Sequence, residues 1–344
     1  MCRIPARFLR AALCLAGVTG APLSADLVRD VIAQATVPEY QGYQRVLTGI
    51  EDVPGIPGFK LVNRYAPNAY ARAAANWIKS NFTGSGLTTS EQGVPGYSPN
   101  IIGERRGTTR PDDIYILSAN YDTYIESGSQ SVAPAADGNG SGTAAMLMAA
   151  RILGQYQFQG TVRFVAFAAK EHGLKGSRAY AQRCAGLGER IRGVINLDML
   201  LYPGFDNLPG NPDYDLDIEA DRWYSPALAN YLADVFNQYT SIQTEVHRAV
   251  IGSGDQAAFW PYGFPAIGLH ENTADEIAGG SNARYHTIED GMDSPNYDWQ
   301  FGLEAVRGGM AGMIGLAGLV PEPGNAVSLL MVVFLLGRAR RAGG

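Results

Sequence analysis

Four side chains that could hold a metal ion occur at similar places in this sequence. Asp137, Glu171 and Asp198 each come after a short apolar stretch, and His286 lies in a polar segment near the end. Carboxylate oxygens and imidazole nitrogens are ligands of zinc, which keeps an open position where it is catalytic. Each of the four residues alone is more often a helix cap, a turn former or a surface charge. Their common placement is what indicates a metal centre.

The apolar stretches predict the elements that must position these side chains. Short runs rich in β-branched and aromatic residues predict strands at 114–119, 162–167, 194–197 and 264–269. Helices are predicted between and after them, at 143–156, at 177–185, from Pro226 onward and at 299–319. This alternation predicts an α/β fold, a three-layer sandwich with a mostly parallel central sheet and helices on both faces. Loops at the carboxyl ends of such strands build the site, so the four candidates are expected to lie together.

Short motifs around these residues resemble those of a known family. Asp137 lies in Ala-Ala-Asp-Gly-Asn-Gly-Ser-Gly, Glu171 in Lys-Glu-His-Gly-Leu-Lys-Gly-Ser, Asp198 in Leu-Asp-Met and His286 in His-Thr-Ile-Glu-Asp. Together with 120–122 and 254–259 they resemble, in order, the motifs of metallopeptidase family twenty-eight, which holds bacterial leucyl aminopeptidases and glutaminyl cyclases. The resemblance runs over roughly 41–319. It implies a zinc-dependent aminopeptidase, in which zinc polarises the carbonyl of a peptide and activates water.

The resemblance also implies a role for each matching residue. Asp137 would bridge two zinc ions, and Glu171 and His286 would complete one of the two sites with it. Asp198 would serve the second site beside a histidine. The substrate would be the N-terminus of a peptide.

The sequence departs from the family pattern at the second zinc site and at the general base. The histidine of that zinc site is Asn120, whose neutral amide oxygen is a poor zinc ligand. Asp122 matches the carboxylate that orients this histidine, and here it has nothing obvious to orient. The family's general base is a glutamate at the position of Lys170, and an ammonium cannot accept a proton. A general base contributes roughly 10²–10⁴-fold in rate.

Lys170 also affects how many zinc ions the protein can hold. An ammonium about 5 Å from a dication is repelled by roughly 5–7 kcal/mol at an effective dielectric near 20. We therefore expect one zinc ion at most, held by Asp137, Glu171 and His286, and no firmly bound second ion. Our hypothesis is that Lys170 replaces the second cation and bonds to Asp198 and Asp137. A solvated lysine on the rim of the loop is the alternative.

The residues leave two functions open. One is an exported protein of the zinc-aminopeptidase family with a single metal ion and weak or lost hydrolysis of N-terminal residues. The other is a catalytically inactive pseudoenzyme of the cell envelope, whose cleft binds a peptide N-terminus or an envelope polymer such as a glycan. Glutaminyl-cyclase chemistry ranks third, because it also uses the glutamate that Lys170 replaces.

Both ends of the chain have the pattern of sorting signals. Arg3, Arg7 and Arg10 precede an apolar run and a small-residue stretch, which predicts a secretory signal peptide over 1–25. Residues 320–344 combine Pro-Glu-Pro, a short apolar run and a basic end, and resemble the PEP-CTERM sorting signal of Gram-negative bacteria. The aminopeptidase-like domain then spans 26–319. We expect an exported protein of the cell envelope, periplasmic or extracellular, whose tail contacts the membrane before processing.

The remaining charged residues indicate little further chemistry. A net charge of −6 and a pI near 5.3 leave no basic surface for nucleic acid. His172 could replace the missing base, although a residue next to Glu171 usually points elsewhere. His270 could line the pocket, although a core position is expected, and His247 is interpreted as structural or surface. The alternating acidic run at 213–221 suggests calcium but has Ile218 where an EF-hand loop needs glycine, so we expect a solvated loop.

Overall fold

The computed structural model of this protein describes residues 24–126, 129–205, 212–213, 215–249, 254–272 and 282–321. The predicted signal peptide and the predicted C-terminal sorting signal lie almost entirely outside these residues. Within the described part of the chain, no helix is both long and apolar enough to cross a membrane.

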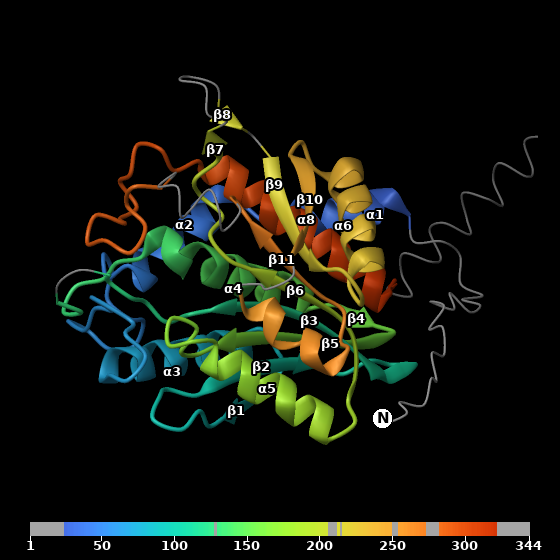
Figure 1. Ribbon diagram of the computed structural model, residues 1–344, viewed down its shortest axis with the longest axis horizontal. Helices are drawn as coiled ribbons and strands as arrows, with labels where there is room; N and C mark the ends of the chain where they lie inside the picture. Colours follow the sequence, from blue (N-terminus) through green and yellow to red (C-terminus); the bar gives the residue numbers. More distant parts are fainter. Residues whose placement is uncertain are drawn as a thin grey trace, which may run out of the picture.

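An eight-stranded sheet runs through the centre of the domain in the order β1-β2-β5-β3-β6-β11-β9-β10 (Figure 1). The strands are β1 (Thr88–Gln92), β2 (Asn100–Arg105), β3 (Arg110–Asn120), β5 (Gly160–Phe167), β6 (Arg190–Leu197), β9 (Asp215–Asp221), β10 (Gln243–Ala249) and β11 (Ala266–His270). The central strands β5, β3, β6 and β11 are parallel, as are β9 and β10. The pairs β1–β2, β2–β5 and β11–β9 are antiparallel. Two small two-stranded ladders join β4 (Gln157–Phe158) to β12 (Leu319–Val320) and β7 (Gly204–Phe205) to β8 (Pro212–Asp213).

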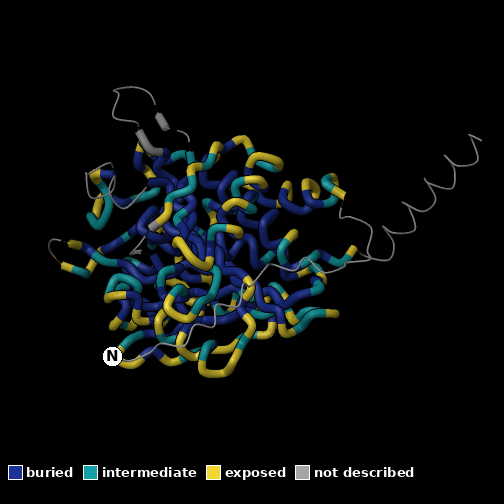
Figure 2. The backbone as a smooth tube through the Cα atoms, turned by 45° about the vertical axis from the view of Figure 1, so that its right-hand side comes forward, coloured by how far each residue is buried: buried dark blue, intermediate teal, exposed yellow. Residues whose placement is uncertain are grey.

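Helices cover both faces of the sheet, which confirms the predicted α/β sandwich. One face carries α1 (Ala25–Ile32), α2 (Val37–Leu47), α3 (Ala69–Gly84), α4 (Ser141–Leu153), α6 (Pro226–Tyr239) and α8 (Trp299–Ala317). The other face carries α5 (Lys175–Gly186) and the 3₁₀ turns η2 (Asp255–Ala258) and η3 (Trp260–Tyr262). Buried residues fill the interior of the domain, and exposed residues lie mostly at its periphery (Figure 2).

Helix α4 begins against the carboxyl end of β6, where the candidate site was expected. Nearly every residue of α4 is buried, in keeping with its Ala, Leu and Met content. A side chain on Gly142 would place its Cβ 2.3 Å from the carbonyl oxygen of Leu197, the last residue of β6. Only glycine therefore allows this close approach. The π-helical turn η1 (Ala136–Gly140), which contains Asp137, directly precedes α4.

The acidic run at 213–221 is not a solvated loop, so that expectation was wrong. Residues Asp215–Asp221 form strand β9, with Leu216, Ile218 and Ala220 buried in the core. The alternation of acidic and apolar residues is the period-2 pattern of a half-buried strand. Asp221, at its end, accepts hydrogen bonds from the main-chain nitrogens of Trp223, Tyr224 and Ser225 and so forms the turn into α6.

Candidate functional site

Asp122 anchors the loop that carries Lys170 and Glu171. Its Oδ1 accepts a hydrogen bond from the Lys170 amide at 3.0 Å, and its Oδ2 accepts one from the Glu171 amide at 3.1 Å. Burial and then the charge of Glu171 raise the pKa of Asp122 to about 7, although the two amides oppose the shift. The expectation that Asp122 has nothing to orient was wrong, because it orients the main chain of two candidate residues.

Four of the candidate side chains meet at the carboxyl ends of the central strands. The Lys170 ammonium lies 3.2 Å from Glu171 Oε1 and 3.2 Å from Asp198 Oδ2. His286 Nε2 lies 3.2 Å from Glu171 Oε2, the other oxygen of the same carboxylate. The exposed fractions of these four side chains range from 4% to 14%. We call Lys170, Glu171, Asp198 and His286 the Lys170 cluster.

The charges of the Lys170 cluster stabilise one another. Burial lowers the pKa of Lys170, but the carboxylates of Asp198 and Glu171 outweigh it and hold the pKa well above its usual range. Burial also raises the pKa of Glu171, but Lys170 and His286 outweigh it and bring the pKa to about 2. At neutral pH the cluster therefore contains an ammonium between two carboxylates, and Lys170 has no basic lone pair.

Asp137 is directed to a different set of partners. Its Oδ1 accepts from the main-chain nitrogens of Leu200 and Leu201 at 3.2 and 3.1 Å, and its Oδ2 accepts from Asn282 Nδ2 at 3.0 Å. Glu271 lies beside it, and burial followed by the charge of Asp137 raises the pKa of Glu271 well above its usual range. No hydrogen bond or ion pair in the described part of the chain joins Asp137 to the Lys170 cluster. The expected bond from Lys170 to Asp137 is therefore not present among the described residues, and the ligand atoms of Asp137, Glu171 and His286 do not all lie within 4.8 Å of one another.

Asn120 faces another asparagine that the sequence did not single out. Its Oδ1 accepts from Asn139 Nδ2 at 2.9 Å, and its Nδ2 lies 3.3 Å from the Asp122 carbonyl oxygen. Asn139 Nδ2 also donates to the Leu197 carbonyl oxygen at 2.8 Å, and its Oδ1 accepts from the Gly142 amide at 2.8 Å. Both side chains are fully buried. The two amides thus join the ends of β3 and β6 to the start of α4, and the Asn120 oxygen is already used.

Two residues close to His286 in the sequence, Tyr285 and Asp290, were not singled out as candidates. The Tyr285 ring stacks on the His286 ring with centroids 3.8 Å apart. A Cβ on Gly138 would lie 3.5 Å from that tyrosine ring. Asp290 accepts hydrogen bonds from the Asp137 and Gly138 amides at 2.9 and 3.0 Å and so holds the η1 turn.

The other three histidines lie outside the Lys170 cluster. His172 packs between the rings of Tyr65 and Tyr97, with centroids 5.2 and 5.0 Å away, and burial lowers its pKa. His270 Nε2 lies 3.6 Å from a carboxylate oxygen of Glu219 on β9. His247, on β10, lies next to Asp217.

The expected zinc ligands do not fit a zinc ion in this arrangement. Among the described residues, an ion pair joins Glu171 to His286, and the ligand atoms of these two and of Asp137 do not all lie within 4.8 Å of one another. An ion between them would lie beside the Lys170 ammonium, which is 3.2 Å from the same glutamate. The resulting repulsion of several kcal/mol at an effective dielectric near 20 opposes binding. We therefore derive no chemical step through a metal ion at this cluster.

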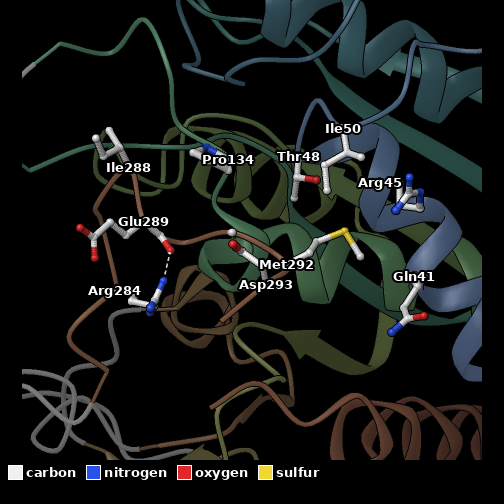
Figure 3. A pocket seen from close by; sticks show the side chains of 11 residues that line it. Gln41, Arg45, Thr48, Ile50, Pro134, Arg284, Ile288, Glu289, Met292 and Asp293 are labelled. Atoms are coloured by element: carbon white, nitrogen blue, oxygen red, sulfur yellow. Dashed lines mark hydrogen bonds between the residues drawn. The ribbon is translucent and has the colours of Figure 1, made fainter. Parts of the chain in front are cut away.

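A surface hollow of about 750 Å³ lies on the segment that carries His286 (Figure 3). Arg284, Ile288 and Glu289 form one wall, and Gln41 and Arg45 of α2 form another. None of its lining residues belongs to the Lys170 cluster. We therefore do not assign this hollow as the place where a substrate would meet that cluster.

Asp255 gives the site a pH dependence that can be tested. It is fully buried, and burial raises its pKa to about 8, although the Ser177 hydroxyl favours the charged form. The unfolded chain releases the Asp255 proton at about pH 3.9, whereas the folded protein keeps it up to about pH 8. The stability that Asp255 contributes is therefore fully present below about pH 3.9 and is lost as pH rises through about 8. Asp255→Asn removes this loss, so its stability relative to the wild type should increase from pH 5 to pH 8, by at most about 1.4 kcal/mol per pH unit.

Urea unfolding of Asp255→Asn and of the wild type at several pH values measures this effect. Asp112→Asn is the matched control, because Asp112 is exposed. A difference between Asp255→Asn and wild type that stays constant from pH 5 to pH 8 would show that Asp255 is ionised in the fold.

Comparison with known proteins agrees with this architecture. The chain is 28% identical to leucine aminopeptidase 1 of Arthroderma otae over 254 residues, which cover 69% of this chain and 65% of that protein. It thus spans slightly less than two thirds of that relative's length. It is also 28% identical to the Escherichia coli protein YfbL over 251 residues, 65% of this chain and 74% of that protein.

Solved structures share the fold at lower identity. The aminopeptidase LapA of Legionella pneumophila superposes with a TM-score of 0.70 at 21% identity, over 90% of this chain and 79% of that one. BSAP, a zinc aminopeptidase from Bacillus subtilis, has a TM-score of 0.65 at 15% identity, over 84% and 96% of the two chains. The sequence pattern of peptidase family M28 matches residues 100–302, more than half of the chain. The protein therefore belongs to peptidase family M28.

Proposed function

We propose that this protein is an exported member of the zinc-aminopeptidase family that binds peptide N-termini and has lost their hydrolysis. The family supports a metallopeptidase ancestry, and relatives named as leucine aminopeptidases and as a zinc aminopeptidase support the substrate class. The two sorting-signal patterns at the ends of the sequence support export to the envelope of a Gram-negative bacterium.

The observation that carries the proposal is the position of the Lys170 ammonium, 3.2 Å from both Glu171 and Asp198. At the place where the family has its general base, this chain has a proton-saturated group between two carboxylates. It cannot take a proton from water, and its charge opposes a cation beside it. Loss of hydrolysis follows from both effects.

The charge of the Lys170 cluster suits a peptide N-terminus. One ammonium and two carboxylates leave a net charge of −1 when His286 is neutral. This net charge attracts a monovalent peptide ammonium, because Lys170 repels it with half the energy with which it repels a divalent ion, and an acetylated N-terminus carries no such charge. The side chains of His286 and Lys170 keep exposed fractions of 14% and 11%, so a ligand can reach the edge of the cluster.

A weakly active single-metal enzyme is the second candidate. It is favoured by the family match, and it requires the Lys170 ammonium to move away so that Glu171 and His286, 3.2 Å apart, can hold a zinc ion. The two candidates differ in whether the unaltered protein turns over a substrate.

Hydrolysis of leucyl-p-nitroanilide by the purified protein, with and without added zinc, separates them. We expect the wild type to stay at background and Lys170→Glu combined with Asn120→His to rise by about 10²-fold or more, since it regains a base. Lys175→Glu with Asn120→His is the matched control, because Lys175 is an exposed lysine nearby. Chelator-sensitive turnover by the wild type would contradict lost hydrolysis.

Binding is measured separately by fluorescence anisotropy with a labelled peptide. The free N-terminus should bind and the acetylated peptide should bind at least about tenfold more weakly. Equal binding of the two peptides would refute recognition of the N-terminus, whatever the result of the hydrolysis assay.

A further inference from the structure

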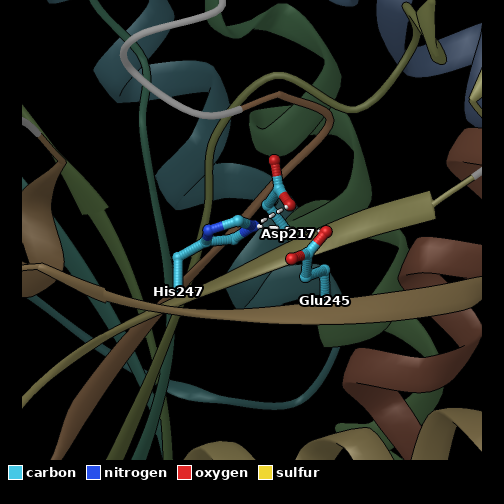
Figure 4. A group of neighbouring side chains, drawn as sticks. All are labelled: Asp217, Glu245 and His247. Carbon is cyan, nitrogen blue, oxygen red and sulfur yellow. Dashed lines mark ion pairs between the residues drawn. The ribbon is translucent and has the colours of Figure 1, made fainter. Parts of the chain in front are cut away.

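A second group of side chains that could bind a metal ion lies at the edge that β10 forms on the eight-stranded sheet. Asp217 on β9 and Glu245 and His247 on β10 point toward one another (Figure 4). One ligand atom from each residue lies within 4.8 Å of the other two. None of these residues belongs to the Lys170 cluster, which contains residues that follow β5 and β6.

The strand register makes this group unusual without a cation. Asp217 and Glu245 are direct partners in the parallel ladder of β9 and β10. Like charges placed directly opposite on neighbouring strands repel and destabilise the pair. The Asp217 side chain is only 7% exposed, so water screens this repulsion less than it would at the open surface.

The imidazole of His247 is aimed between these two carboxylates. Its Nε2 lies 2.7 Å from Asp217 Oδ1 and 3.9 Å from Glu245 Oε2. The same nitrogen is shielded from water and makes no well-aligned hydrogen bond with the described residues. A polar atom in this position is readily satisfied by a metal ion that accepts its lone pair.

Small shifts of these side chains would admit a tetrahedral ion. Zinc binds imidazole nitrogen and carboxylate oxygen at about 2.0–2.2 Å, so two ligands of a tetrahedral zinc ion lie about 3.4 Å apart. The two measured separations, 2.7 and 3.9 Å, lie on either side of this value. The Glu245 side chain is 65% exposed and can move toward the ion, and water can fill the fourth position.

We propose that Asp217, Glu245 and His247 bind a divalent metal ion of the zinc type at the edge of the sheet. A nitrogen ligand favours zinc over calcium, which takes oxygen ligands. The neighbouring carboxylate of Glu219 is not a ligand, because Gln256 donates to it and His270 lies beside it. The ion neutralises the paired carboxylates and fastens the edge strand β10 to β9, which makes its role structural.

Calorimetric titration of the purified, chelator-treated protein with Zn²⁺ tests the proposal. We expect one ion to bind to the wild type, and His247→Gln and Glu245→Gln to weaken binding by at least about tenfold. Zn²⁺ should also raise the melting temperature of the wild type but not that of His247→Gln. Because Glu245 is exposed on an edge strand, its replacement leaves the fold intact even if His247→Gln does not fold.

Two control variants locate the ion. His286→Gln removes the histidine of the Lys170 cluster, and His172→Gln removes a histidine that packs between two tyrosine rings. Both should bind Zn²⁺ as the wild type does. Unchanged affinity in both His247→Gln and Glu245→Gln, or a wild type that binds no Zn²⁺, would overturn the proposal. Loss of binding in His286→Gln alone would assign the ion to the Lys170 cluster instead.

Discussion

Lys170→Ala is expected to lower the free energy of unfolding by about 3–5 kcal/mol. The change removes the only cation that lies within 3.2 Å of both Glu171 and Asp198 among the described residues. It leaves two buried carboxylates close together, and breaking a buried ion pair by removing one partner costs more than the pair itself contributes. Urea unfolding monitored by tryptophan fluorescence measures the loss.

The matched control is Lys175→Ala. Lys175 lies at the start of α5 and is exposed, so its replacement should change the free energy of unfolding by no more than about 0.5 kcal/mol. Unchanged or increased stability of Lys170→Ala would mean that Lys170 is solvated on the loop rim, as the alternative from the sequence had it.

A double-variant cycle then isolates the pair. Lys170→Met keeps most of the side-chain volume and removes the charge, and Asp198→Asn removes the charge of its partner. The double variant should be more stable than the sum of the single losses predicts, because no buried charge is left unpaired between these two positions. Strict additivity would show that Lys170 and Asp198 do not interact.

The parts of the fold that could be predicted from the sequence are those with long apolar runs. The buried strand β5 and the helices α4 and α8 have few polar residues, so their type was clear before any tertiary contact was known. Strand β1, with the sequence Thr-Thr-Ser-Glu-Gln, is an edge strand without an apolar pattern and was not predicted. Its pairing with β2, and not its own side chains, makes it a strand.

The candidate site, too, could be predicted from the sequence only in part. That Lys170, Glu171, Asp198 and His286 come together could be predicted from their places after parallel strands. The direction of Asp137 could not, because it depends on where the loop after β6 presents the amides of Leu200 and Leu201. A motif gives the position of a residue along the chain, and the neighbours that its side chain contacts are decided by packing.

Arg64 is the clearest example of a residue that no motif marked. It is fully buried, and it donates from Nε to the Tyr121 carbonyl oxygen at 2.8 Å and from Nη1 to that of Pro134 at 2.9 Å. It also donates to the carbonyl oxygens of Leu47 and Ala135. Burial lowers the pKa of Arg64 to about 10, although Asp290 and Asp122 oppose the shift, so the side chain stays charged at neutral pH.

We expect Arg64→Met to lose about 3–5 kcal/mol of stability or to prevent folding. Four carbonyl groups, three of them in fully buried contacts, lose their donor, and each buried unsatisfied group costs about 1–3 kcal/mol before the loops adjust. Arg64→Lys should lie between Arg64→Met and the wild type, because an ammonium keeps the charge but lacks the planar set of donors. Urea unfolding measures the order, and Arg64→Lys keeps the test possible if Arg64→Met is insoluble.

The control is Arg72→Met, which removes an arginine whose side chain is 48% exposed and which pairs with Glu91 at 2.9 Å. An exposed ion pair contributes about 0–1 kcal/mol, so this variant should unfold close to the wild type. Equal stability of Arg64→Met and Arg72→Met would mean that the loops at Leu47, Tyr121 and Pro134 hold together without the guanidinium. The predicted difference in stability between Arg64→Met and Arg72→Met follows from the segments that Arg64 joins. Tyr121 directly precedes Asp122, whose side chain accepts hydrogen bonds from the Lys170 and Glu171 amides. By joining the Tyr121 and Pro134 segments, Arg64 also supports the loop that carries these two residues of the Lys170 cluster.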